Sequence, residues 1–201
     1  MALRTNTSTI SDILQKRGIP DRATYGFYHT TCTHALAGFA HTVRTIPNET
    51  GSWKRADFDR IFNGIEPGNV LIIANDGAPI ASLGDMACLC AKARGALGAV
   101  IDGCIRDAEA ITEMDWPVYA KGFVPFSTVG KVDLISVEKP VLCSGAKVSE
   151  GDFVLSDKSG IVFIPKEIYQ EVIEEAIIAE SNEDKIRAAI LSGVDFSKAF
   201  D

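Results

Sequence analysis

Two continuous apolar runs separated by a helix-length segment most strongly constrain the fold of this 201-residue chain. The first run lies within residues 66–76, EPGNVLIIAND, and the second within 98–103, GAVIDG. Short apolar runs without polar alternation are typical of strands buried on both faces. Apolar residues between them fall on one face of a helix predicted over 85–94, which Gly95 ends. Since strand, helix and strand in succession normally form a parallel pair with a right-handed crossover, we expect an α/β fold.

The remaining segments add helices and further strands around this unit. Helical spacing and end signals predict helices over residues 8–18, 52–65 and 166–193. Apolar and β-branched residues predict strands over 34–47, 116–122 and 131–141, and a hairpin over 146–165 with its turn at 157–160. Residues 77–84 are expected to form a loop. No repeat, linker or low-complexity tract is present, so we expect residues 1–201 to form one compact α/β domain, with a mixed sheet flanked by helices.

Composition excludes several classes of partner. Hydrophobic residues make up 46% and charged residues 23%, as in globular proteins that fold throughout. A net charge of −7 argues against a basic surface for nucleic acid, and no apolar run approaches the ~20 residues of a membrane span. Five cysteines, an odd number in apolar surroundings, fit reduced thiols. We therefore expect a cytoplasmic protein that binds neither nucleic acid nor membrane.

Charged residues at both ends of the helix–strand segment predict a ligand site. The loop entering a helix and the end of the following strand can share one edge of an α/β sheet, where ligand sites collect. Asp85 and the pair Arg106–Asp107 can therefore converge. Gly84 allows close backbone approach, and the N–H groups around Asp85, Met86 and Ala87 can receive a carboxylate.

The chemistry of these side chains suits an oxo acid and a divalent cation. Arg106 offers a planar fork of donors for carboxylate or carbonyl oxygens, and Asp107 offers a hard oxygen ligand for Mg²⁺ or Mn²⁺. Asp85 can act as a second acid, through water on the metal. The other interpretation makes Asp85 a helix-terminal charge and Arg106–Asp107 a surface pair opening the next helix. Spacing alone favours this second interpretation.

A family resemblance changes that balance. The spacing Asp85-X20-Arg106-Asp107 resembles the pattern of class II pyruvate aldolases related to 4-hydroxy-4-methyl-2-oxoglutarate aldolase, in the superfamily of the regulator of ribonuclease E activity A. Further blocks resemble the family in order: SDIL, GFAHTV, PGNVLIIAND, GAVIDGCIRD, PVYAKG and GDFVLSDKSGIVFIP. The resemblance implies a domain of the swivelling β/β/α type, assembled as a homotrimer or homohexamer with active sites at subunit boundaries.

The resemblance also implies roles for individual residues. By position, the substrate-carboxylate loop is Gly84, Asp85, Met86 and Ala87, the substrate-binding arginine is Arg106, and the ligand of a Mg²⁺ or Mn²⁺ cofactor is Asp107. Two departures concern the pocket. The loop commonly carries two leucines where Met86 and Ala87 stand, and an early block carries Pro and Val where Phe39 and His41 stand.

The implied function is a metal-dependent lyase that cleaves a 4-hydroxy-2-oxo acid to pyruvate, with oxaloacetate decarboxylation at the same site. Arg106 and Asp85 are then the catalytic residues. The base is a metal-activated water with Asp85, or a glutamate of another subunit such as Glu180 or Glu183, although glutamates on helix surfaces are usually only solvated. Two alternatives stay open: a non-catalytic protein-binding regulator, and a lyase for a different oxo acid.

Other reactive residues favour structural roles. Cys88 and Cys90 point apart on a helix, so packing is favoured over a shared metal. Cys104 lies in an apolar strand, which favours a buried, inert thiol. His29, His34 and His41 lack a zinc-binding pattern, and His41 is notable because it departs from the family.

Overall fold

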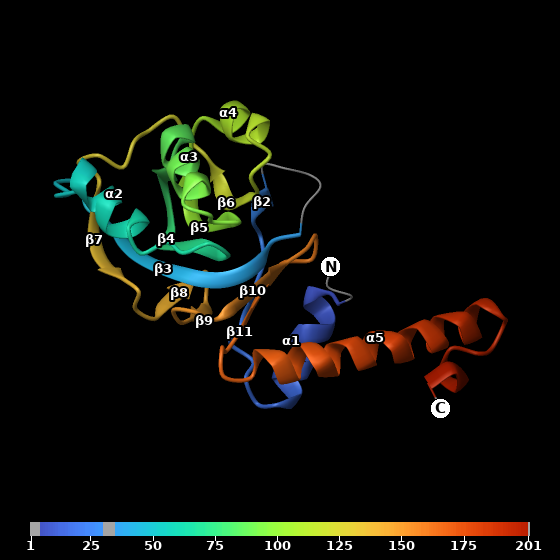
Figure 1. Ribbon diagram of the computed structural model, residues 1–201. Coiled ribbons are helices and arrows are strands. Elements are labelled where there is room, and N and C mark those ends of the chain that lie inside the picture. Colours follow the sequence, from blue (N-terminus) through green and yellow to red (C-terminus); the bar gives the residue numbers. More distant parts are fainter. Residues whose placement is uncertain (1–4, 30–34, 201) are drawn as a thin grey trace.

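The computed structural model describes residues 5–29 and 35–200, which form a mixed sheet flanked by helices (Figure 1). The helices are α1 (Thr7–Lys16), α2 (Arg55–Phe62), α3 (Asp85–Ala93), α4 (Ala108–Glu113), α5 (Tyr169–Leu191) and the 3₁₀ turn η1 (Ser197–Phe200). The strands are β1 (Ala23–Thr24), β2 (Tyr28–His29), β3 (Ala37–Pro47), β4 (Asn69–Leu83), β5 (Gly98–Ile105), β6 (Val118–Phe123), β7 (Val132–Val137), β8 (Val141–Cys143), β9 (Ala146–Val148), β10 (Phe153–Ser156) and β11 (Ile161–Ile164).

Four parallel strands form the centre of the sheet. The order is β1-β11-β10-β3-β4-β5-β6-β2, with β7 also paired to β3 and with β8 and β9 forming a separate two-stranded sheet. β3, β4, β5 and β6 run parallel, and the outer strands pair antiparallel. β5 is buried along its whole length, as its continuous apolar run predicts. The expected α/β fold with a mixed sheet flanked by helices is confirmed.

Alternate residues of the central strands pack on opposite faces of the sheet. On one face, Leu71 and Ile101 lie in a cluster with residues of α2, α3 and α4. On the other face, Ile72 and Val100 lie in a cluster with β8 and β9. A third cluster joins α1 and α5 to β10 and β11. The three helices of the first face approach the sheet edge where the central parallel strands end (Figure 1), and this edge carries the site.

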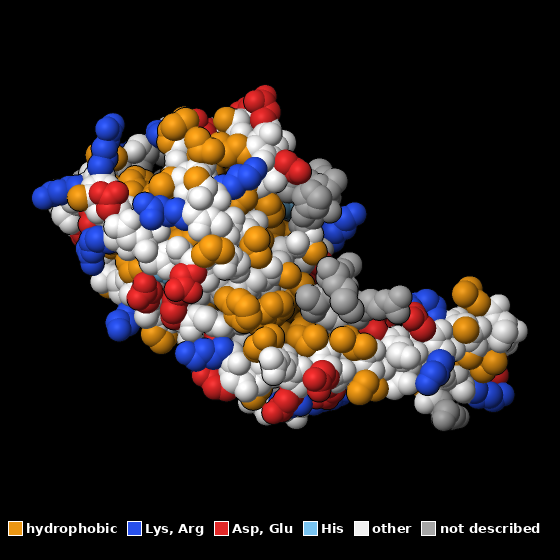
Figure 2. Space-filling view, viewed as in Figure 1, with side chains coloured by type: hydrophobic (Ala, Val, Ile, Leu, Met, Phe, Trp, Pro, Cys, Tyr) orange, Lys and Arg blue, Asp and Glu red, His pale blue; other side chains and the backbone are white. Residues whose placement is uncertain are grey.

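The last helix extends beyond the body of the molecule (Figure 1). Only Val172 and Ala176 of α5 are buried. Ile178 and Leu191 are exposed, and Figure 2 shows hydrophobic and charged side chains interspersed along this projection. Among the described residues, no helix has the length and apolar character needed to cross a bilayer.

Two boundaries differ from the sequence expectation. The segment 77–84 was expected to be a loop, but β4 continues to Leu83, because three register shifts let its irregular second half keep pairing with β5. The hairpin turn at 157–160 is confirmed by the pair β10–β11, with Ser156 opposite Ile161. Residues 146–148, however, pair with β8 and lie outside that hairpin.

Candidate active site

A cavity of about 580 Å³ lies at the carboxyl ends of the central strands, beside α2 and α3. Its lining comes from four separate stretches of the chain, within residues 55–62, 81–90, 106 and 127–129. An isolated bridge between Ala81 and Ser127 holds the last of these stretches against the end of β4. The ordered sheet is therefore what assembles the cavity, since no single segment contains it. A cavity of this size and polar–apolar mixture is typical of a small-molecule site.

The residues predicted at the two ends of the helix–strand segment do converge. The backbone N–H of Asp85 faces Oδ2 of Asp107, with 3.3 Å between nitrogen and oxygen. Nε of Arg106 lies 3.3 Å from the same oxygen. The backbone N–H of Arg106 donates to the carbonyl of Leu83 at 3.1 Å, which joins the start of the β5–α4 connection to the end of β4.

Glycine is required at position 84 because there is no space for a side chain. A Cβ at Gly84 would lie 2.5 Å from Oδ2 of Asp107 and 2.8 Å from Nε of Arg106. Its φ of −126° is one that any residue adopts, so the constraint is steric and not conformational. At Asp107 the constraint is conformational instead. Its φ of 56° lies in the left-handed region, where Asp and Asn are tolerated better than most residues. The crowding at Gly84 thus comes from side chains of the same chain, and the close approach of a ligand there stays a prediction.

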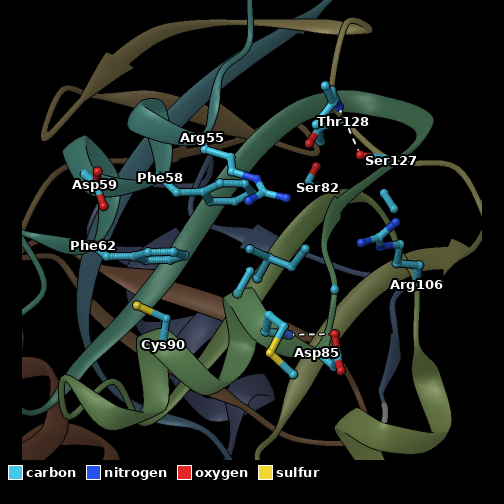
Figure 3. A pocket seen from close by; sticks show the side chains of 16 residues that line it. Arg55, Phe58, Asp59, Phe62, Ser82, Asp85, Cys90, Arg106, Ser127 and Thr128 are labelled. Carbon is cyan, nitrogen blue, oxygen red and sulfur yellow. Dashed lines mark hydrogen bonds between the residues drawn. The ribbon is translucent and has the colours of Figure 1, made fainter.

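The start of α3 presents backbone donors to the cavity. The N–H of Met86 donates to Oδ1 of Asp85 at 2.7 Å, as drawn in Figure 3. The N–H of Asp85 is oriented toward Asp107, and the N–H of Ala87 has no acceptor within the described part of the chain. Carboxylates thus already lie at two of the three donors predicted to bind a substrate carboxylate. A ligand carboxylate can use the Ala87 donor directly, and can use the Met86 donor once the Asp85 side chain turns away.

The donor set around Asp107 fits a hard divalent cation better than zinc. Among the residues that the structure describes, no group of three or more His, Cys, Asp or Glu side chains is arranged to hold a metal. Mg²⁺ commonly takes only one or two carboxylates and completes its shell with water and substrate oxygens. The Asp107 carboxylate, 39% exposed beside the cavity residue Arg106, is suited to that mode of binding.

The far wall of the cavity escaped the sequence analysis. Phe58 and Phe62 of α2 face the cavity from the side opposite Arg106, and Arg55 and Asp59 lie at its rim (Figure 3). In the sequence, these phenylalanines contributed only to the helical spacing that predicts a helix over 52–65. Nothing in their spacing distinguishes a core-facing ring from one that lines a cavity next to the core.

The two glutamates considered as a base lie on α5, outside the cavity of their own chain. Oε1 of Glu180 accepts hydrogen bonds from the side chains of Asn6 and Thr9, at the start of α1. Glu183 forms an ion pair with Arg187 at 3.5 Å. Both have structural partners within the protomer, and a contribution to a neighbouring subunit stays a prediction.

His41 is fully buried beneath α2. Its Nε2 lies 2.9 Å from the carbonyl oxygen of Ile61, and its Nδ1 lies 3.2 Å from Oε1 of Glu150. A carbonyl oxygen and an ionised carboxylate both accept hydrogen bonds, so the imidazolium form is the one that can donate to both. Burial opposes that charge, but the hydrogen bond and charge of Glu150 outweigh it, and the pKa of His41 is raised. His41 thus anchors the helix that forms the far wall, without lining the cavity.

The remaining candidates have separate environments. Cys88 is buried, whereas Cys90 is half-buried and lines the cavity, so only Cys88 has a purely packing role. Cys104 is buried, and burial raises the pKa of its thiol. His29 packs its ring at 5.8 Å from that of Tyr119, and His34 lies outside the described residues.

The comparisons with known proteins agree with the fold. A model of an RraA-like family, described as Aldolase/RraA, matches residues 7–163. This range covers most of the sequence, and the chain belongs to the RraA-like family.

Individual relatives carry different descriptions. "Uncharacterized protein MJ0644" of Methanocaldococcus jannaschii is 43% identical over 113 residues, 56% of this chain and 53% of that protein, so the chain spans about half the length of this relative. A protein of Halalkalibacterium halodurans named "Putative 4-hydroxy-4-methyl-2-oxoglutarate aldolase" is 28% identical over 166 residues, 82% of this chain and 76% of that protein.

A solved structure shares the fold over almost all of the chain. Streptomyces coelicolor RraAS2, described as an unusual member of the RNase ES inhibitor RraA protein family, superposes with a TM-score of 0.82 at 27% identity. The alignment covers 92% of this chain and 93% of that one. The family therefore includes proteins described as aldolases and proteins described as inhibitors of RNA processing enzymes.

Proposed function

We propose that the chain is a divalent-metal-dependent carbon–carbon lyase that cleaves a 4-hydroxy-2-oxo acid to pyruvate and decarboxylates oxaloacetate at the same site. The observation that carries the proposal is the meeting of Arg106 and Asp107 with the start of α3 at one cavity. An arginine, a carboxylate and the N–H donors of a helix start are the groups that hold a 2-oxo acid beside a hard cation.

The reaction needs a carbanion to be stabilised. As the C3–C4 bond of the substrate breaks, its electron pair passes to C3 and gives the enolate of pyruvate, while the 4-hydroxyl proton goes to a base and C4 leaves as a carbonyl group. The enolate then takes a proton at C3. Decarboxylation of oxaloacetate gives the same enolate with CO₂ as the leaving group, which is why one site serves both reactions.

Each residue has a separate task in this mechanism. The N–H groups at the start of α3 bind the substrate carboxylate, and the guanidinium of Arg106 stabilises the charge on the keto oxygen as the enolate forms. Asp107 would hold Mg²⁺ or Mn²⁺, which when bound supplies further stabilisation of that oxyanion. Asp85 lines the cavity and is the protomer's own candidate base for the 4-hydroxyl proton.

Assembly of several copies belongs to the same proposal. A neighbouring subunit would supply the alternative base from α5, where Glu180 lies at the middle of the helix and Glu183 one turn further on. The exposed Ile178 and Leu191 on that helix provide apolar area for such contacts.

Pyruvate release tests the lyase directly. Purified protein is incubated with oxaloacetate or with 4-hydroxy-4-methyl-2-oxoglutarate, in Mg²⁺ or in EDTA, and pyruvate is followed. Because Mg²⁺ itself can promote loss of CO₂ from oxaloacetate, Asp107→Asn protein at the same metal concentration is the control. Mg²⁺-dependent release above that control supports the proposal, and release equal to the control from both substrates overturns it.

A second candidate function is the binding of a protein partner as a regulator. The 0.82 TM-score to Streptomyces coelicolor RraAS2 favours it. A regulator without catalysis has no need for the Asp107 carboxylate beside a cavity. The pyruvate-release assay therefore distinguishes the lyase from the regulator. Inactivity with both substrates, together with inhibition of an RNase E-type ribonuclease in a cleavage assay, would favour the regulator.

A further inference from the structure

Phe58 and Phe62, which form the far wall of the cavity, have no role in the proposed reaction. Phe58 and Phe62 stack with ring centroids 5.5 Å apart and planes at 14°. Trp53, which is buried, packs edge-on against Phe58 with centroids 5.0 Å apart. The wall is therefore a rigid aromatic surface, because packing fixes Phe58 from behind and Phe62 is itself almost fully buried.

The rim above this wall carries two opposite charges. Arg55 and Asp59 stand four residues apart on α2, and both line the cavity. Both side chains are exposed to solvent. Figure 3 shows the Arg55 guanidinium extending past Phe58 toward the middle of the cavity, whereas Asp59 lies farther from Arg106.

The opposite end of the cavity has the polar groups assigned to pyruvate. Arg106 and Asp85 lie on the side away from the phenyl rings (Figure 3). The cavity of about 580 Å³ is within the range that takes drug-sized ligands, so it has room for a substituent well beyond a three-carbon acid. A substrate with its oxo-acid half at Arg106 thus directs its C4 substituent toward α2.

Building on the proposed function, we propose that the C4 substituent is an aromatic ring or a similarly flat apolar group, packed on Phe58 and Phe62. A ring gains from stacking and from removal of apolar area from water. A carboxylate in the same place would lose hydration against phenyl rings, and Arg55 is the one cation of α2 that lines the cavity to replace it. The released carbonyl compound is accordingly an aryl aldehyde or ketone.

Binding of non-cleavable 2-oxo acids tests the wall separately from catalysis. Titration calorimetry compares 2-oxo-4-phenylbutanoate, 2-oxoglutarate and 2-oxobutanoate, which carry a phenyl group, a carboxylate and a hydrogen at C4, on wild-type protein in Mg²⁺. We expect the phenyl compound to bind about tenfold more tightly than the other two. Phe58→Leu, which keeps an apolar side chain but removes the flat ring, should lose most of that preference.

Two variants of α2 make the comparison specific. Arg60→Ala changes an exposed arginine of the same helix that does not line the cavity, and should leave all three affinities unchanged. Arg55→Ala should leave the phenyl preference intact. Tighter binding of 2-oxoglutarate that Arg55→Ala abolishes would overturn the inference in favour of a distal carboxylate, and equal binding of all three acids would also overturn it.

A further measurement distinguishes failure of this inference from failure of the lyase. Exchange of the C3 protons of pyruvate in D₂O, followed by NMR, requires only the pyruvate end of the cavity. Exchange without a phenyl preference leaves the lyase standing and overturns the aromatic substituent. Absence of exchange overturns the lyase. In that case the ratio of the affinities for 2-oxo-4-phenylbutanoate and 2-oxoglutarate still shows which group binds against Phe58 and Phe62.

Discussion

Oδ2 of Asp107 lies 3.3 Å from the backbone nitrogen of Asp85, 22 residues earlier in the chain. One carboxylate therefore contacts the first N–H of α3 while also standing at the start of α4. A change at Asp107 consequently affects both the charge of the site and the position of the helix that is to bind the substrate carboxylate.

Asp107→Asn removes the charge of this side chain while the backbone conformation at residue 107 is kept. Asn tolerates the left-handed φ of 56° about as well as Asp, so the fold should be retained, whereas Ala would add backbone strain of about 1 kcal/mol. We expect enolate formation from pyruvate to fall about 100-fold or more and its response to Mg²⁺ to disappear. Proton exchange by NMR at several Mg²⁺ concentrations measures both effects. An unchanged Mg²⁺ response would exclude Asp107 as the ligand.

Gly84→Ala tests the steric requirement at the same junction. The added Cβ would be 2.5 Å from Asp107 and 2.8 Å from Arg106, so both side chains must move. A displacement of about 1 Å can cost about 100-fold in rate, and we expect a loss of this order in kcat/KM for oxaloacetate. Gly122→Ala is the matched control, because its Cβ would meet nothing nearer than Cys104 Sγ at 3.5 Å. Similar losses in both variants would contradict the specific role of Gly84.

His41 should make stability depend on pH. Burial opposes its charge but Glu150 overcomes this, so the folded pKa of His41 is raised above the unfolded value of about 6.5. A raised pKa adds stability that is complete below about pH 6.5 and is lost as pH rises through the folded pKa. Glu138, which approaches the ring near Gly64, acts in the same direction.

Urea unfolding of His41→Gln and of the wild type at several pH values tests this dependence. The free energy of unfolding in urea should be lower in the variant than in the wild type at pH 6, and the gap should narrow as pH rises. The pKa of Glu150 is lowered, because its hydrogen bonds with His41 and Thr42 outweigh the effect of burial, so Glu150 titrates below this pH window. A gap that stays constant from pH 6 to pH 9 would show that His41 is neutral in the folded protein.

Cysteine labelling should report occupation of the cavity. Burial, with the charges of Asp85 and Asp107, raises the pKa of Cys88 to about 12, and burial also raises the pKa of Cys104 and Cys143. In a Cys32→Ser background, we expect iodoacetamide to modify Cys90 first, and bound 2-oxo-4-phenylbutanoate to slow the reaction. Peptide mass spectrometry identifies the modified residue. Labelling of Cys88 at a similar rate would imply that α3 opens in the folded protein.

The position of the candidate residues at the start of α3 and just after β5 was accessible to sequence reasoning, because it depends on local order. The strand–helix–strand pattern fixes a parallel pair, and a parallel pair brings the start of α3 and the end of β5 to one edge. The meeting of these two ends follows from that rule, whereas the site roles of Gly84, Asp85, Arg106 and Asp107 were predicted from the family resemblance, since spacing alone favoured surface charges. The direction of each side chain and the left-handed backbone at Asp107 follow from neither.

The parts that depend on tertiary contacts were not accessible. The continuation of β4 to Leu83 rests on three register shifts against β5, and no pattern within 77–84 encodes them. The roles of Phe58 and Phe62 depend on what lies opposite α2. The raised pKa of His41 depends on Glu150, 109 residues away, and on a helix-end carbonyl.

The division of the cavity lining among four distant stretches has a kinetic consequence. Loops between these stretches must close before the lining exists, and long-range pairing is the slow part of folding. Recovery of enolate formation during refolding should therefore trail the recovery of helical circular dichroism. The recovery of enolate formation would then report when the whole parallel sheet is complete.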